Sequence, residues 1–569
     1  MAAFRGYGPM RIRTTPLLAA VTLASGCGTS NEARPTEPPT PAAIGAEVAV
    51  TGGSVRGVVG EHGLKQYHGI PYAAPPIGES RWAPPGPVEP WPGIRNADSP
   101  GPGCFQQGAQ GGFYDAATAV ASMDEDCLTL NVWTRASHVD EGLPVMVWIH
   151  GGGLTVGSGD AYPGELLTSK GVVLVTINYR LGPFGFLALP ELTAQSESGV
   201  SGNQGFRDQI ASLEWVQGNI ASFGGDPNNV TIFGESAGSM SVSLLQASPL
   251  AKGLFHRVIG QSGSALGPMA FRARPTPYAN AAEAIGMEFA RALAGDGGDT
   301  SLQALRALPA DHILATFLSN PGFRSALAIV DDEVLPDEIG AIFTAGEQAD
   351  VPVLIGSNAD EGSALFSYIG PAFGDGAAGR AAYIQATLAE VADGIDEHYP
   401  AGDDDAQATE SWLALMTDAS FTYPMRAWAK GMATVPSDAY LYWFTWAPPI
   451  AERERYGAFH AAEIGYVFGN LELFDAVPAS HDRVLSELMA TMWTNFARTG
   501  VPDGEGLPAW PAYTSENEAY MEFGLDSGAR SGLKTAKMEL FERAWALRRE
   551  SAQQAAASST GSGAQGSDR

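Results

Sequence analysis

The sequence is short of positive charge. Its 569 residues include 33 Lys and Arg against 63 Asp and Glu, which gives a formal net charge of −30 at pH 7. Such acidity repels nucleic-acid phosphates and anionic lipid headgroups, and it argues against binding to a phosphate backbone. Charged residues make up 17% and hydrophobic residues 45% of the chain, as in ordinary globular proteins. The composition therefore predicts a folded globular protein that does not act on nucleic acid.

Long hydrophobic runs are lacking as well. The N-terminal apolar run, Leu17–Gly26, follows Arg11 and Arg13 and is too short to span a bilayer as a stable helix, a pattern typical of an export signal. Because residues 23–27 (Leu-Ala-Ser-Gly-Cys) resemble the lipobox of bacterial lipoproteins, we predict a lipoprotein-type signal peptide over residues 1–27. Lipidation of Cys27 would make the protein a bacterial cell-envelope lipoprotein, with the lipid anchor as its only membrane contact. The alternative is a plain signal peptide and a secreted or periplasmic protein, because Ala24 stands where Leu, Val or Ile is commoner.

Cysteine is scarce, with three residues in the whole chain. Cys27 belongs to the predicted signal, which leaves Cys104 and Cys127 as an even pair in an exported protein. The simplest assignment is a disulfide between them, which closes a loop with a sequence separation of 127 − 104 = 23 residues. In the chain-entropy model such a bond stabilises the folded state by about 3 kcal/mol.

The segment patterns predict an α/β fold. Residues 28–45 are rich in Pro, Thr, Ala and Glu without a hydrophobic period, which predicts a disordered tether. Glu47–Gly69 carries alternating valines around a Gly-Gly pair, typical of a small antiparallel hairpin. Val145–His150 and Val172–Tyr179 are short β-branched runs that fit buried parallel strands, and Asn203–Phe223 has helical apolar spacing. In such sheets active sites form beyond the carboxyl ends of the strands.

A candidate active-site turn lies at Ser236. Val230–Phe233 is typical of a buried strand, residues 234–238 (Gly-Glu-Ser-Ala-Gly) turn sharply, and Met240–Ala247 is an apolar helical segment. This arrangement is a nucleophile elbow, in which the turn strains the backbone and exposes the serine hydroxyl while the glycines leave room for neighbouring backbone. A Gly-x-Ser-x-Gly match alone can arise by chance in a Gly-rich chain, so the flanking strand and helix carry the prediction.

A serine nucleophile needs a base, an acid that orients the base, and donors for the oxyanion. The run His150-Gly151-Gly152-Gly153 follows a predicted strand and allows successive backbone N–H groups to face one point, as in lipase and esterase oxyanion holes. Asp360 and Glu361 are acid candidates because they follow the predicted strand Val351–Gly356. Nine histidines are available as the base, and the residues alone do not single one out.

Several stretches occur in a family-specific order, namely Gly69–Pro85, Glu125–Trp133, Asn178–Leu187, Phe223–Gly238 and Trp493–Gly500. Together they resemble the type B carboxylesterase family, which includes cholinesterases and bacterial para-nitrobenzyl esterases. The resemblance implies an α/β-hydrolase fold, with a large, mostly parallel central sheet covered by helices on both faces and with helical lid insertions. We therefore expect a catalytic domain over residues 46–550, closed by a helix over Lys534–Glu550. A low-complexity, frayed tail is expected over residues 551–569.

The same resemblance assigns the parts of the site. The family's histidine motif matches Gly457–Gly469 and makes His460 the base, and its Asp-Glu-Gly element makes Glu361, rather than Asp360, the acid. The chain order of Ser236, acid and base is that of α/β hydrolases. The remaining assignments are Gly152, Gly153 and Ala237 as oxyanion donors, Glu235 and Glu463 as carboxylates that bias the base, and Ser262 as a brace for the acid.

These assignments predict an exported serine esterase that hydrolyses a small-molecule ester, requires no metal or cofactor, and is monomeric. The predicted disulfide loop contains Phe113 and Tyr114 but not the tryptophan that stacks on choline in cholinesterases, so acetylcholine is not indicated. Carbamates, thioesters and lactones stay open because they share the acyl chemistry. The alternative from another class is a catalytically inactive, neuroligin-like surface binding protein, against which the intact Ser, Glu, His and glycine set argues.

Overall fold

A computed structural model describes residues 44–108, 114, 120–277, 279–474 and 477–563. Its strands are β1 (Ile44–Val50), β2 (Gly53–Val59), β3 (Lys65–Pro71), β4 (Ile94–Asn96), β5 (Gly103–Cys104), β6 (Met123–Asp124), β7 (Thr129–Thr134), β8 (Leu143–Ile149), β9 (Val173–Ile177), β10 (Gly225–Glu235), β11 (Arg257–Gln261), β12 (Ala270–Phe271), β13 (Ile329–Val330), β14 (Val353–Asn358), β15 (Ala439–Phe444), β16 (Ala519–Phe523) and β17 (Gly528–Ser531).

The α-helices are α2 (Glu165–Ser169), α3 (Gly182–Phe186), α4 (Pro190–Gln195), α5 (Gln204–Asn219), α6 (Ala237–Ala247), α7 (Ala282–Ala294), α8 (Leu302–Arg306), α9 (Ala310–Ser319), α10 (Ile339–Ala345), α11 (Glu361–Ile369), α12 (Gly376–Thr387), α13 (Ala392–His398), α14 (Asp405–Thr417), α15 (Tyr423–Gly431), α16 (Arg453–Tyr456), α17 (Ile464–Val467), α18 (Ser480–Thr499) and α19 (Thr535–Gly563). A π-helical turn over Asp418–Thr422 joins α14 to α15.

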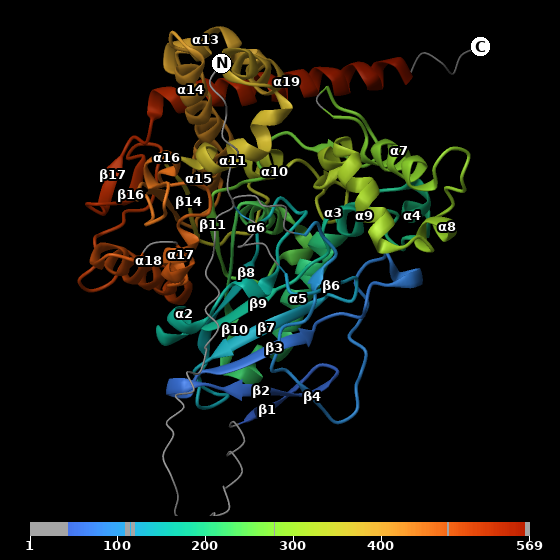
Figure 1. The fold of residues 1–569 in the computed structure, drawn as a ribbon, viewed down its shortest axis with the longest axis vertical. Coiled ribbons are helices and arrows are strands. Elements are labelled where there is room, and N and C mark those ends of the chain that lie inside the picture. Colours follow the sequence, from blue (N-terminus) through green and yellow to red (C-terminus); the bar gives the residue numbers. More distant parts are fainter. Residues whose placement is uncertain (1–43, 109–113, 115–119, 278, 475–476, 564–569) are drawn as a thin grey trace, which may run out of the picture.

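One large twisted sheet runs through the molecule in the order β1-β2-β3-β7-β9-β8-β10-β11-β14-β15-β16-β17, with β4 beside β2 (Figure 1). From β9 to β16 in this order the strands pair in parallel. The pairs toward the two edges are antiparallel, except that β4 pairs with β2 in parallel. The apolar runs predicted as buried parallel strands are β8 and β9. The predicted α/β-hydrolase architecture, mostly parallel and helix-covered, is confirmed.

Side chains alternate along each strand and therefore point to opposite faces of the sheet. On the central strands both faces are buried. On β8, Val145, Val147 and Ile149 belong to one apolar cluster, which includes residues of α5, α6 and α15. Met146 and Trp148 point to the opposite cluster, which includes residues of α17 and α18. A strand buried on both faces must be apolar throughout, which explains the continuous run that marked β8 in the sequence.

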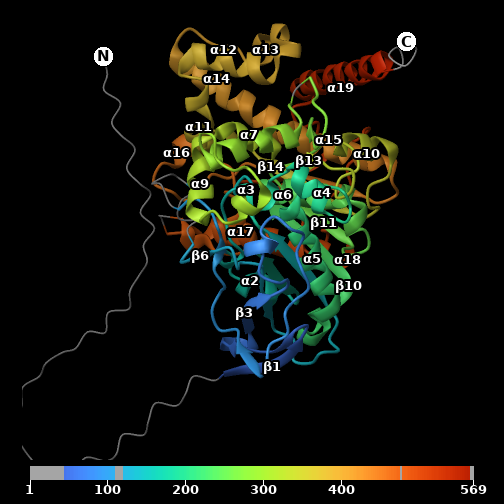
Figure 2. The same cartoon turned by 90° about the vertical axis from the view of Figure 1, so that its right-hand side faces the viewer.

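The helical insertions gather away from the sheet. The segment α7 to α9 lies to one side of it, and α12 to α14 form a separate group beside which α19 runs (Figures 1 and 2). This group has its own apolar cluster, which includes side chains from α12, α13, α14 and the first part of α19. The predicted closing helix is therefore present, but it continues past Glu550 to Gly563, into the segment expected to fray. The reason is local, because the segment is rich in Ala and Gln, which are strong helix formers.

The sheet includes residues slightly before the predicted start of the catalytic domain at residue 46. Strand β1 starts at Ile44 and pairs antiparallel with β2, with Ile44 opposite Val58, so the last residues of the predicted tether belong to the sheet. The hairpin itself is as predicted. The signal peptide, Cys27 and residues 28–43 lie outside the described residues. Within the residues that the structure describes, no helix has the length and apolar character needed to cross a membrane.

Candidate active site

The turn at Ser236 has the geometry of a nucleophile elbow. It joins β10 to α6, with φ 56° and ψ −119° at Ser236, a region that L-residues rarely adopt. The N–H of Ser236 donates to the carbonyl of Gln261 at 2.8 Å, which fixes the turn against the next strand. A Cβ at Gly238 would lie 2.0 Å from the carbonyl oxygen of Ile149, and one at Gly234 would lie 2.5 Å from the same atom. Only glycine fits either position, so the motif follows from close backbone packing.

The predicted base and acid lie together. Glu361 is the first residue of α11, directly beyond β14, and its side chain is fully buried. Its Oε2 accepts a hydrogen bond from Nδ1 of His460 at 2.6 Å, and its Oε1 accepts one from the backbone N–H of Asn358 at 2.7 Å. A carboxylate on Nδ1 fixes the tautomer and ring orientation of a histidine. The rival Asp360 instead accepts the N–H of Ala458 at 2.9 Å and holds the histidine loop.

The other ring nitrogen of His460 faces the residue before the serine. Its Nε2 lies 3.2 Å from Oε1 of Glu235, and both side chains are almost completely buried. Ser236 is partly exposed, and no hydrogen bond joins its hydroxyl to His460 or to any other described residue. The structure therefore brings the base beside the elbow and places Nε2 at ion-pair distance from the carboxylate of Glu235, which had been expected only to bias the base electrostatically.

Burial and charge perturb this pair strongly. Burial raises the pKa of Glu235 to about 8, although His460 opposes the rise. Burial by itself lowers the pKa of His460, but the surrounding carboxylates, Glu235 first among them, reverse this and raise it to about 9. Since each group ionises according to the state of the other, the two titrate as a pair. His460 becomes a free base when the pair gives up its proton or when Glu235 holds it.

A buried polar network lies behind the acid. Glu463 is fully buried and accepts hydrogen bonds from the amides of Gln261 at 3.0 Å and Asn358 at 2.5 Å. Burial, followed by the charge of Glu361, raises the pKa of Glu463. Asn358 therefore connects both carboxylates, a role that the sequence analysis missed although it lies three positions before the acid. The predicted brace, Ser262, is buried with φ 56°, but its hydroxyl makes no hydrogen bond to Glu361 or to other described groups.

The glycine run forms a tight loop against the elbow. Gly152 and Gly153 have φ values of 95° and 62°, and the carbonyl of Gly152 accepts the N–H groups of Thr155 at 3.0 Å and Val156 at 3.1 Å. The N–H groups of Gly152, Gly153 and Ala237 have no acceptor in the described part of the chain. A Cβ at Gly151 would lie 3.2 Å from the Cβ of Ser236, so the loop packs on the nucleophile. Three free donors beside the serine are what an oxyanion hole requires.

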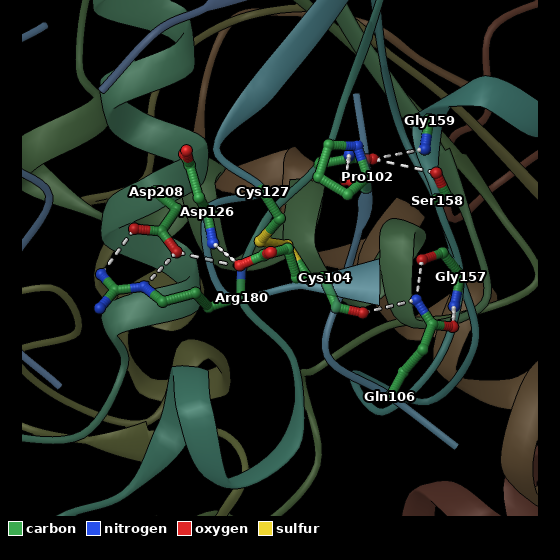
Figure 3. Close-up of a disulfide and its surroundings, with 12 residues drawn as sticks. Pro102, Cys104, Gln106, Asp126, Cys127, Gly157, Ser158, Gly159, Arg180 and Asp208 are labelled. Atoms are coloured by element: carbon green, nitrogen blue, oxygen red, sulfur yellow. Dashed lines mark hydrogen bonds and ion pairs between the residues drawn. A yellow bond between two sulfur atoms is a disulfide. The ribbon is translucent and has the colours of Figure 1, made fainter. Parts of the chain in front are cut away.

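The predicted disulfide between Cys104 and Cys127 is present and buried, with a Cα–Cα distance of 5.0 Å (Figure 3). Within the loop that it closes, Tyr114 donates its hydroxyl to the carbonyl of His460 at 2.9 Å. Phe113 lies outside the described residues. The π-helical turn presents Phe421, whose ring centroid lies 4.8 Å from that of His460. The histidine is thus bordered by aromatic side chains from two distant segments.

Among the described residues, no group of three or more His, Cys, Asp or Glu side chains is arranged to hold a metal ion. The groups assembled around Ser236 can take a proton, orient the base and donate to an oxyanion.

Comparison with known proteins gives a consistent result. A sequence model of the carboxylesterase family matches residues 45–541. Fumonisin B1 esterase of Sphingopyxis macrogoltabida is 36% identical over 495 residues, covering 84% of this chain and 87% of that protein. Carboxylesterase 1D of Mus musculus is 34% identical, covering 83% of this chain and 87% of its own. Cocaine esterase of Homo sapiens is 34% identical, with 85% and 87% covered.

Proposed function

Because the chain belongs to the carboxylesterase family and is a carboxylic-ester hydrolase, we propose that it acts through an acyl-enzyme formed on Ser236. The observation that carries the proposal is the 2.6 Å contact between His460 and Glu361, made beside a strained elbow that only glycine neighbours permit. An adhesion-type protein would have no need of a buried, carboxylate-oriented histidine at this point.

The reaction proceeds in two acyl transfers. Ser236 Oγ attacks the ester carbonyl while its proton passes to Nε2 of His460, and the carbonyl oxygen becomes an oxyanion. The N–H groups of Gly152, Gly153 and Ala237 stabilise that charge. As the intermediate collapses, the leaving alcohol takes the proton from His460. Water then attacks the acyl-enzyme by the same route, which releases the acid and restores the serine.

The pairing of His460 with Glu235 sets a condition on this cycle. Nε2 of His460 lies 3.2 Å from Oε1 of Glu235. During catalysis it has to leave this contact and accept the proton of the Ser236 hydroxyl instead. When Glu235 is protonated it no longer favours the imidazolium, so the pKa of the base falls toward the value that catalysis needs. Glu361 stays on Nδ1 throughout and stabilises the imidazolium in the transition state. The pair thus adjusts the basicity of His460.

The substrate is proposed to be a small ester whose alcohol or acyl group meets the aromatic side chains Tyr114 and Phe421 beside His460. The names of similar proteins refer to fumonisin B1, cocaine and fatty acyl-CoA, so family membership alone selects no single ester. Hydrolysis rates for a panel of p-nitrophenyl and naphthyl esters with graded acyl lengths define the preference. Carbamates, a thioester and a lactone belong in the same panel because they share the acyl chemistry.

We also propose that the enzyme is exported and held at the bacterial cell envelope by lipid on Cys27. The signal-like residues 1–27 and the buried Cys104–Cys127 disulfide, which forms in oxidising compartments, support this location. Mass spectrometry of the mature N-terminus tests it. A diacylated or triacylated Cys27 is expected, and an unmodified N-terminus at another residue contradicts the lipid anchor.

The test of the catalytic proposal is hydrolysis of short-chain p-nitrophenyl esters by three proteins: wild type, Ser236→Ala and Ser198→Ala. Ser198 is exposed and hydrogen-bonds only to the neighbouring Ser196 among the described residues, so its variant controls for the substitution itself. Activity is expected in the wild type and the control and should vanish in Ser236→Ala. Equal activity in all three, or none in the wild type, refutes the mechanism.

A further inference from the structure

Gln106 lies at the start of the disulfide-closed segment, two residues after Cys104, and its side chain is almost completely buried. Its Oε1 accepts the N–H of Gly157 at 2.7 Å, and its Nε2 donates to the carbonyl of Gly157 at 2.8 Å and to that of Cys104 at 3.0 Å (Figure 3). The N–H of Gly157 requires an acceptor, and the carbonyls of Gly157 and Cys104 require a donor. These partners therefore determine which end of the Gln106 amide is the oxygen and which is the NH₂ group. The side chain pairs with Gly157 as a neighbouring strand would.

Gly157 is where the glycine loop ends. Residues 152–156 form a turn closed on the carbonyl of Gly152, and a Cβ at Gly152 would lie 2.1 Å from the carbonyl oxygen of Val156. The entrance of the loop is held by β8 and by the hydroxyl of Tyr179, which donates to the carbonyl of His150 at 2.9 Å. The loop ends at Gly157, which has a φ of 117° and is held by the side-chain amide of Gln106.

Gly157 has no room to shift toward His150 if the hydrogen bonds to Gln106 are lost. A Cβ there would lie 2.3 Å from Nδ1 of His150, so the two ends of the loop are in contact. A second tie runs parallel to that of Gln106. The amide of Asn178 donates to the carbonyl of Pro102 at 3.1 Å and accepts the N–H of Gly159 at 2.8 Å. Both sets of hydrogen bonds connect the residues around Cys104 to the segment that follows the glycine loop.

We propose that Gln106 is a positioning residue for the oxyanion hole: its amide fixes Gly157 and thereby the direction of the N–H groups of Gly152 and Gly153. This inference rests on the oxyanion hole of the proposed function and adds a residue to its support. Loss of the amide should leave Ser236 and His460 in place, because neither contacts it, but should let the donors drift. Substrate binding then changes little, whereas stabilisation of the oxyanion falls.

The test compares wild type with Gln106→Met, which keeps the length of the side chain and removes all three hydrogen bonds. Since misplacing catalytic groups by about 1 Å costs up to about 100-fold, kcat should fall by about 10- to 100-fold while KM stays within about threefold. The inhibition constant of a trifluoromethyl ketone, whose adduct with the serine carries an oxyanion, should rise in proportion. Gln107→Leu is the matched control, because Gln107 is partly exposed and its side chain makes no hydrogen bond to the described residues.

A second variant keeps the inference testable if Gln106→Met folds poorly. In Gln106→Glu the ionised carboxylate can accept from Gly157 but cannot donate to its carbonyl, whereas the protonated acid can do both. The ratio of its kcat to that of wild type should therefore rise as the pH falls. A purely structural role predicts lower thermal stability with an unchanged kcat per titrated active site.

Several outcomes separate the two levels of the claim. Failure of the wild type to hydrolyse esters, or a ketone that does not engage Ser236, defeats the proposed function itself. If the wild type is active, but the folded Gln106→Met variant keeps its kcat and ketone affinity within about twofold, the role of Gln106 is overturned. A pH-independent activity ratio for Gln106→Glu overturns it as well.

Discussion

Replacing Glu235 by Gln is expected to move the acidic limb of the pH–rate profile to lower pH. The change is nearly isosteric and removes one negative charge located 3.2 Å from Nε2 of His460. Whenever Glu235 is ionised, its charge favours the imidazolium and contributes to the raised pKa of His460 of about 9, and the neutral amide of Gln removes this contribution. Because the reaction needs the neutral imidazole, the variant should keep kcat/KM at pH values where the wild type has already lost it.

The size of the shift follows from the distance. Two unit charges 3.2 Å apart interact by about 1 kcal/mol in bulk water and about 5 kcal/mol at an effective dielectric constant of about 20, corresponding to about 1 to 4 pH units. Both groups are almost completely buried, so a shift of at least about one unit is expected.

The assay is kcat/KM for an uncharged p-nitrophenyl ester across the pH range in which both proteins stay folded, with Glu472→Gln as a control at an exposed position. An uncharged substrate matters because Glu235 could otherwise act on the charge of the ester. An acidic limb that stays in place in Glu235→Gln, or that moves to higher pH, refutes the coupling between Glu235 and His460.

Three further changes test other parts of the structure. Glu361→Gln should lower kcat by about 10³- to 10⁴-fold with little change in KM, because the amide no longer stabilises the imidazolium; a loss below tenfold contradicts its role. Gly152→Ala should lower kcat by about 10²- to 10³-fold because its Cβ would lie 2.1 Å from a backbone oxygen, whereas Gly218→Ala, which meets no atom within 4 Å, should keep full activity. Arg180→Met should destabilise the protein by about 3 to 5 kcal/mol in urea unfolding, since it leaves Asp208 buried without its ion-pair partner (Figure 3); a cost under about 1 kcal/mol would count against this.

The parts of the fold that were predictable are those set by local pattern. The apolar runs at β8 and β9 and the helical spacing of α5 identify buried strands and a covering helix, because burial on both faces or on one face leaves a period in the sequence. The continuation of α19 past Glu550 was not predicted, because a low-complexity segment is expected to fray at a chain end, whereas an Ala-rich segment also has strong helix propensity. The composition of this segment alone does not distinguish a frayed chain end from a continued helix.

The site was predictable where motifs carry geometry. Ser236 directly follows β10, and Glu361 lies shortly after β14. Both residues therefore stand at the carboxyl ends of parallel strands as a consequence of the chain order. Asn358 and Gln106 were missed because their roles depend on hydrogen bonds between segments that lie far apart in the sequence, which no local pattern records. The contact of Glu235 with Nε2 of His460 is of the same kind. Side-chain amides and carboxylates in such tertiary networks become visible only once the backbone is placed.

The most direct measurement of the central claim is covalent trapping. The protein is incubated with a fluorophosphonate, residual ester hydrolysis is followed, and the modified peptide is identified by mass spectrometry. We expect a single adduct on Ser236, with activity lost in step with labelling, and no adduct in the Ser236→Ala variant. An adduct at another residue, or full ester hydrolysis by protein completely labelled at Ser236, contradicts the assignment of Ser236 as the nucleophile.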